Sequence, residues 1–238
     1  MVAVLPEPPL LVLELATGAA AETAELRGAC VAAASRLAGA APRWIAVGAD
    51  AGGRRTVGPD VRGSFIGFGV DVVVGLGPDA DGPVDPRLPL PLLVAGWVAG
   101  RTGALVRVRG ELVAPDADPA ECARVGTELA AECAADPEPV GLLVVGDGAA
   151  THTLKAPGYL DERAGPFDAA VATALRTADR AALTALDPGL AAQLWAAGRA
   201  PWQVLAAATD GGAWHGELLH SSIPFGVAYH VAVWTPAP

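Results

Sequence analysis

The stretch GLLVVGDGAATHTLKAPGYLDERAGPFD, residues 141–168, decides the fold of this chain. Its apolar segment, Leu142–Val145, predicts a buried strand, and a helix is expected to begin near Pro166. Between them lies a polar loop with a histidine, His152, and five candidate ligand-binding residues: Gly146, Asp147, Gly148, Lys155 and Tyr159. Open α/β sheets bind ligands where buried strands end in such loops. The stretch therefore predicts an α/β protein with a ligand site at this strand end.

Each residue type in the loop has a chemical reason to contact a ligand. Glycines allow positive φ angles and a close approach of the ligand to the main chain. The charge of His152 changes near neutral pH, Lys155 is the only lysine and can neutralise an anion, and Tyr159 offers a hydroxyl. The spacing from Gly146 to Thr151 does not complete a nucleotide-binding glycine motif, so a structural turn is favoured over a phosphate-binding loop.

Strands and helices alternate along the rest of the chain, which predicts a single α/β domain over residues 1–238. The expected strands are Val2–Leu5, Trp44–Val47, Gly67–Leu76, Leu105–Val108, Glu111–Val113 and Val140–Val145. The expected helices are Ala20–Leu37, Leu92–Arg101, Asp118–Cys133 and several between Phe167 and Ala208, followed by a hairpin of Trp214–His220 and Val227–Trp234. This order predicts a three-layer α/β/α sandwich with a mostly parallel central sheet.

Composition excludes several classes of protein. The net charge of −10 and the absence of a basic cluster argue against nucleic-acid binding. No apolar run is long enough to span a membrane, and the first fifteen residues lack the basic start of a signal peptide. Three widely spaced cysteines, Cys30, Cys122 and Cys133, predict reduced thiols in a cytoplasmic protein.

Two acidic positions outside the loop are notable. Glu7 lies between prolines at the end of the first strand, where a charged side chain is either solvated or functional. His215 and Glu217 share one face of a strand, which allows an iron or zinc site, but no second histidine follows at the right phase. We therefore favour the interpretation that His215 and Glu217 are exposed residues of an edge strand.

Three segments resemble the class III extradiol dioxygenase B-subunit-like (LigB-like or Memo-like) proteins of high-GC, actinobacterial-type bacteria. They are LPEPPLLVLEL (5–15), the stretch 141–168 and ELLHSSIPFGVAYHVAVW (217–234), and the resemblance runs from about Val2 to Trp234. It implies the LigB-like dioxygenase fold.

The resemblance also implies an iron site, from which this chain departs. The family pattern has a histidine where PEPPLL has Glu7, and a second histidine after the second strand, where this chain offers Asp50 and Ala51. Glu217 is a candidate counterpart of the family's iron-binding glutamate, and His152 falls in the acid–base region. Ligand-binding candidates therefore include Glu7 and Asp50, and Glu7 and Glu217 are the remnants of the metal site.

Two classes of function follow. The first is a non-catalytic or repurposed protein that needs no cofactor and binds a small polar molecule or a protein partner. The alternative is an enzyme, either an Fe(II)-dependent extradiol-type dioxygenase with a carboxylate-rich site or another chemistry in the same cleft. Loss of both histidines favours the first, because ferrous iron sites normally need imidazole. The sequence does not identify the ligand or the pathway, and it does not determine whether the chain forms a homo-oligomer.

Overall fold

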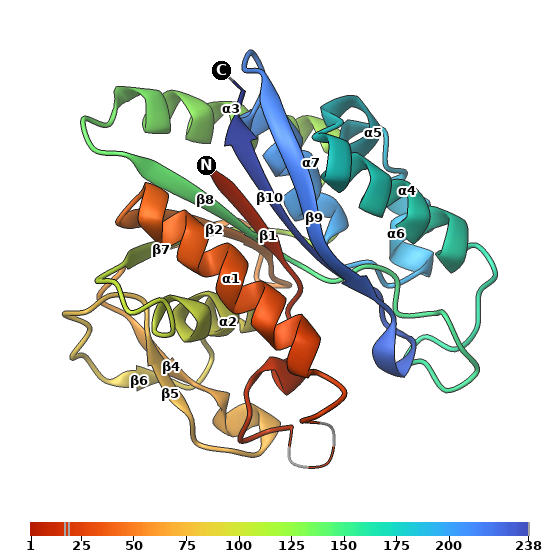
Figure 1. Cartoon of the computed structure of the whole chain (residues 1–238), viewed down its shortest axis with the longest axis horizontal. Coiled ribbons are helices and arrows are strands. Elements are labelled where there is room, and N and C mark those ends of the chain that lie inside the picture. The colour runs from red at the N-terminus through yellow and green to blue at the C-terminus, as the bar shows by residue number, and fades with distance from the viewer. Residues whose placement is uncertain (17, 19, 238) are drawn as a thin grey trace.

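The computed structural model describes residues 1–16, 18 and 20–237, and it shows a mixed α/β fold built on a seven-stranded sheet (Figure 1). In spatial order the strands are β3 (Arg55–Val57), β7 (Arg107–Val113), β2 (Arg43–Ala49), β8 (Val140–Val145), β1 (Val2–Leu5), β10 (Tyr229–Pro236) and β9 (Trp214–Ser222). The consecutive strands β7, β2, β8 and β1 run parallel, whereas β3, β10 and β9 each pair antiparallel with their neighbours. The predicted mostly parallel sheet is confirmed, with the C-terminal hairpin at one edge.

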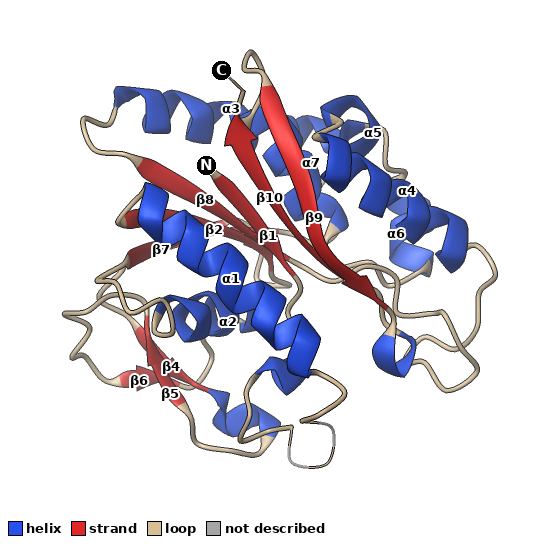
Figure 2. Ribbon diagram, viewed as in Figure 1, coloured by secondary structure: helices blue, strands red, loops and turns tan. Residues whose placement is uncertain are grey.

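Helices cover both faces of this sheet (Figure 2). On one face, α1 (Ala24–Ala40) and α2 (Leu90–Ala99) enclose a core that includes Leu37, Trp44 and Trp97. The opposite face is covered by α3 (Pro119–Ala135), α4 (Ala164–Thr177), α5 (Arg180–Thr184), α6 (Pro188–Gln193) and α7 (Arg199–Ala208). Residues two apart on a strand face the same way, so neighbouring strand residues enter different cores. Ala3 belongs to the first core and Val4 to the second.

Helix α3 shows why some elements were predictable. Asp118 accepts a hydrogen bond from the backbone N–H of Glu121 at 2.7 Å, and Pro119 occupies the first helical position. This arrangement satisfies a donor that the helix start would otherwise leave unpaired. The expected helix start at Asp118 is confirmed.

The segment Gly67–Leu76 differs from expectation. It contains the end of a 3₁₀ helix, Phe65–Phe68, and a short strand, β5 (Val73–Gly75). This strand pairs with β4 (Arg62–Ser64), which also pairs with β6 (Val84–Asp85), in a separate small sheet. Gly69 has a φ of 101°, which ends the 3₁₀ helix and redirects the chain. The two strands expected over residues 105–113 form the single strand β7.

No helix in the described part of the chain has the length and apolar character needed to cross a membrane.

Candidate functional site at the carboxyl edge of the sheet

The carboxyl ends of β1 and β8 bring Glu7 and Asp147 together. These strands pair in parallel from Val2 with Leu142 to Leu5 with Val145, so the residues that follow them emerge at the same edge. The backbone N–H of Glu7 donates to Oδ1 of Asp147 at 2.7 Å. Glu7 is 8% exposed, and its Oε2 is buried without a hydrogen-bond partner among the described residues.

Burial of this carboxyl pair favours its protonated form. It raises the pKa of Glu7 well above the usual range, and the negative charge of Asp147 raises it further. Burial also raises the pKa of Asp147 to about 7, against the opposing effect of the hydrogen bond from Glu7. The pKa of the Cys30 thiol on α1 and that of Tyr229 on β10 rise first through burial and then through the charge of Asp147. The pair therefore retains a proton near neutral pH.

A second polar cluster lies on the opposite face of the sheet and is centred on Asp168 of α4. Its Oδ2 is 2.6 Å from Nε2 of His152, and its Oδ1 is 3.3 Å from Nε2 of His230. The backbone N–H of Ala149 also donates to this carboxylate, at 3.1 Å from Oδ2. The other ring nitrogen of His230, Nδ1, is 3.0 Å from the hydroxyl of Ser221. The expected acid–base candidate, His152, is thus held by a buried carboxylate.

Asp168 was not among the residues predicted from the sequence, although a signal was present. Asp168 precedes Val171 by three residues and Leu175 by seven, so it shares their helical face, and all three are buried. A single acid on an apolar helix face predicts a buried hydrogen-bonded group. Its histidine partners were not predictable, because His230 is separated from it by 62 residues.

The loop glycines Gly146 and Gly148 allow close packing, and neither has the positive φ angle that glycine permits. The positive-φ glycines in the described chain are Gly53, Gly69, Gly103, Gly211 and Gly226. A Cβ atom on Gly146 would lie 2.6 Å from the Cα of Gly198, and one on Gly148 would lie 2.3 Å from Oδ1 of Asp168. These glycines let β8 end directly against α7 and against the Asp168 cluster.

Two other loop residues lie at the surface. Lys155 is exposed, and Tyr159 is 63% exposed with a φ of 63°. Glycine adopts this left-handed conformation readily, whereas a bulky aromatic residue rarely does. The backbone N–H of Tyr159 donates to the carbonyl of Ala156 at 2.9 Å, which closes the turn.

Asp50 follows β2 but does not join the carboxyl pair. Its Oδ2 lies 3.2 Å from a guanidinium nitrogen of Arg55 and accepts a hydrogen bond from the N–H of Gly52. Within the described chain, no hydrogen bond or ion pair joins it to Glu7 or Asp147. The predicted constellation therefore divides into the carboxyl pair, the Asp168 cluster and a surface group around Asp50.

Glu217 and His215 lie on the outer strand β9, away from the carboxyl edge. Glu217 is exposed and forms an ion pair with Arg36 at 2.6 Å. His215 is also exposed, as favoured for this pair. Over residues 1–16, 18 and 20–237, no group of three or more His, Cys, Asp or Glu side chains has an arrangement that could hold a metal ion.

The donor set at the carboxyl edge does not fit the iron site that the resemblance implies. Glu7 and Asp147 supply carboxyl groups only, and the nearest imidazole by sequence, His152, is held by Asp168. Ferrous sites of this kind normally need imidazole ligands. The residues at this edge therefore do not support a reaction step through iron.

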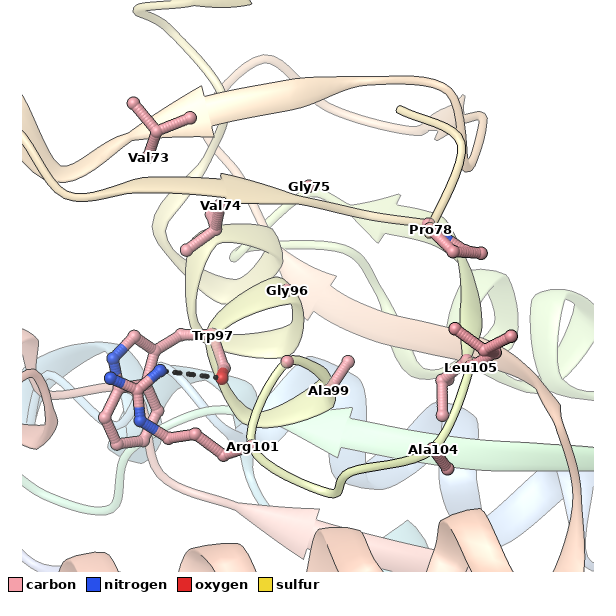
Figure 3. Close-up of a pocket in the computed structure, with 13 residues that line it drawn as sticks. Val73, Val74, Gly75, Pro78, Gly96, Trp97, Ala99, Arg101, Ala104 and Leu105 are labelled. Carbon is pink, nitrogen blue, oxygen red and sulfur yellow. Dashed lines mark hydrogen bonds between the residues drawn. The ribbon is translucent and has the colours of Figure 1, made fainter. Parts of the chain in front are cut away.

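Two cavities lie near opposite ends of β7. One, of about 350 Å³, is close to the start of the strand, between β5, the end of α2 and the segment before Arg107. Figure 3 shows its lining, in which the guanidinium of Arg101 lies 3.7 Å from the ring centre of Trp97 while Leu105 lies on another side. The other cavity, of about 500 Å³, is close to the end of β7 and is bordered by α6 and Trp195.

Comparisons with known proteins support the fold. A crystal structure of JW3007, described as an uncharacterized protein from Escherichia coli K12, matches with a TM-score of 0.53 and 14% sequence identity. The match covers 98% of this chain and 98% of that chain. A likeness at this identity shows a shared fold alone. No protein-family model matches the sequence, and no curated protein does.

Proposed function

We propose that this chain is a non-catalytic or repurposed protein on a LigB-like dioxygenase fold, and that it binds a small polar molecule beside Glu7 without iron. The observation that carries the proposal is the unpaired Oε2 of Glu7 among the described residues. A buried acceptor without a donor costs about 1–3 kcal/mol, so native proteins nearly always supply a partner. A polar ligand supplies that partner, because it can donate to Oε2 as a carboxylate or carbonyl oxygen, or accept from Oε2 when that oxygen carries the proton.

The position of Glu7 supports this proposal. It follows a parallel strand at the edge where α/β sheets bind ligands, and it replaces the first histidine of the family pattern. The loop from Gly146 to Tyr159 lies at the same edge, where Asp147 contacts Glu7 directly and Lys155 is exposed to solvent. Three free cysteines support the further proposal that the protein acts in the cytoplasm.

Metal analysis tests the iron-free part of the proposal. The protein is purified anaerobically with Fe(II) present, and its iron content and catechol cleavage are measured. We expect no stoichiometric iron in wild type, in Glu7→Ala or in the matched surface variant Glu138→Ala. One iron per chain that is lost in Glu7→Ala and kept in Glu138→Ala, together with catechol cleavage, would overturn the proposal.

Fragment screening tests the position of the ligand. Small polar fragments are added to isotope-labelled protein, and amide shifts are mapped by NMR. We expect hits to shift Glu7 and residues of the loop, and Glu7→Leu to abolish those shifts because it removes the acceptor. Hits that leave Glu7 and Asp147 unperturbed would place the ligand elsewhere.

An enzyme at this edge is the second candidate, and the Asp168 cluster favours it. A carboxylate that orients an imidazole recurs in general acid–base catalysis, and Asp168 contacts the imidazole of His152 at 2.6 Å. Acid–base groups act without a metal, so this candidate predicts hydrolysis of an added activated ester that His152→Ala abolishes while thermal unfolding remains cooperative. Absence of turnover in wild type contradicts it.

A further inference from the structure

The cavity at the end of β7 is separate from the Glu7 site and has a size suited to a small ligand. Its volume is about 500 Å³, within the roughly 300–1,000 Å³ typical of ligand pockets. Pro115 and Asp116 from the segment after β7 form one side, and α6 with the following turn forms the other. The lining is mainly apolar, from Pro115, Pro188, Ala191, Ala192 and Ala196.

Arg199 gives this cavity a positive charge. The residue is 2% exposed, and its guanidinium donates to the carbonyls of Ala117 at 2.5 Å and Pro115 at 2.7 Å, and to Oε1 of Gln203 at 3.0 Å. These acceptors are neutral. No carboxylate of the described residues lies within 4.0 Å of the guanidinium nitrogens, although buried charges are normally paired with an opposite charge. Arg199 therefore forms no ion pair among the described residues, and the acidic residue of the cavity lining, Asp116, is exposed to solvent.

Trp195 forms an exposed aromatic wall in a strained conformation. Trp195 is among the residues that line the cavity, it is 58% exposed, and its φ is 56°. A left-handed backbone at a non-glycine residue costs about 1–3 kcal/mol and persists where surrounding contacts enforce it. Here the carbonyl of Leu194 accepts from the N–H of Ala150, and Gly158 approaches the indole so closely that an added Cβ would lie 3.3 Å away. The loop of the carboxyl edge thus holds Trp195 in position.

We propose that this cavity binds a small organic monoanion, a carboxylate with an apolar body. The apolar body packs on Trp195 and the alanines of α6, and the negative charge is stabilised by Arg199. Exposed Asp116 at the mouth disfavours a second negative charge, so dicarboxylates bind more weakly. This inference does not depend on the proposed function, because Glu7 and Asp147 do not line the cavity.

Titration with octanoate and its neutral analogue octanamide tests the role of charge. Calorimetry gives Kd, and amide shifts of Ala192 and Trp195 locate the site. Octanoate is expected to bind at least about tenfold more tightly than octanamide, and suberate, which carries a carboxylate at each end, more weakly than octanoate. Equal affinity of octanoate and octanamide would overturn the assigned role of Arg199.

A cavity-filling variant keeps the test independent of folding. Ala192 is exposed and lines the cavity, so Ala192→Trp fills the space without disturbing the core. Its neighbour Gln193 is exposed and lies outside the lining, so Gln193→Trp is the matched control. Octanoate affinity is expected to fall at least about tenfold in Ala192→Trp and to stay unchanged in Gln193→Trp. Equal affinity of both variants, or no octanoate binding by wild type, would refute the site.

Discussion

The carboxyl pair and the Asp168 cluster lie at the same sheet edge but differ in how their polar atoms are satisfied. Asp168 receives hydrogen bonds from the backbone of Ala149 and pairs with two imidazoles, so its carboxylate is well supplied with donors. Glu7 is similarly buried, yet its Oε2 has no donor in the described chain. A satisfied buried network stabilises one conformation, whereas an unsatisfied group costs stability. We infer that the first cluster supports the fold and that the second is kept for a ligand.

The two clusters also lie on opposite faces of the sheet. Tyr229, beside the carboxyl pair, belongs to the core under α1, whereas the ring of His230 lies 6.3 Å from that of Trp202 in the core under α7. Adjacent residues of one strand therefore contribute to different clusters, as the alternation of strand side chains requires. Variants in one cluster are expected to act independently of those in the other.

The largest expected effect is at Asp168. Asp168→Ala removes the acceptor shared by His152, His230 and the backbone of Ala149, and leaves buried donors unpaired. We expect the free energy of unfolding to fall by about 3–5 kcal/mol, measured by urea denaturation. Asp79→Ala, which removes an exposed carboxylate, is the control and is expected to change stability by less than about 0.5 kcal/mol. A loss below about 1 kcal/mol for Asp168→Ala would contradict the supporting role.

The next effect is a pH dependence that originates in the carboxyl pair. The pKa of Asp147 is raised to about 7, so between about pH 4 and pH 7 the folded state binds more protons than the unfolded state. The stabilising contribution is complete below about pH 4 and is lost as the pH rises through about 7. Asp147 is only half-buried, so solvent screens part of this effect, and we expect wild type to lose about 1–3 kcal/mol more than Asp147→Asn over this range. Parallel stability–pH curves for the two proteins would show that burial does not perturb this group.

A smaller effect of opposite sign is expected at Glu7. Glu7→Leu removes an unpaired buried carboxyl and should leave stability unchanged or raise it by about 1 kcal/mol at pH 8. This outcome contrasts with the loss at Asp168 and sharpens the distinction between the two clusters. Urea denaturation of both variants in one buffer measures it. A loss of more than about 2 kcal/mol would mean that Glu7 has a structural partner.

The elements that could be predicted from the sequence are those determined by residues close together in the chain. Asp118 caps a helix three residues away, and the apolar run before Gly146 marks a buried strand. Contacts set by packing could not be predicted from the sequence: Asp168 contacts His230 only because the fold brings α4 against the start of β10. The strand expected over Gly67–Leu76 was wrong for a similar reason. Alternating residues are compatible with any sheet, so they did not predict that this segment joins the separate three-stranded sheet of β4, β5 and β6. Glu7 was identified because prolines flank it, and Asp147 because it stands between two glycines directly after the apolar segment Leu142–Val145.

The smallest effect is expected at Glu217, which together with Glu7 is a remnant of the metal site that the resemblance implies. Glu217 lies on the outer strand β9, where its side chain is 50% exposed and pairs with Arg36 at 2.6 Å. Exposed ion pairs contribute about 0–1 kcal/mol because solvent screens the charges and the side chains lose entropy. We expect Glu217→Ala to change the free energy of unfolding by less than about 0.5 kcal/mol, and Arg36→Ala to match it, since each removes the same pair. Fragment shifts at Glu7 should stay as in wild type. If Glu217→Ala instead removed those shifts, the edge strand would contribute to the ligand site, and the separation of the carboxyl pair from the remaining carboxylates would be wrong.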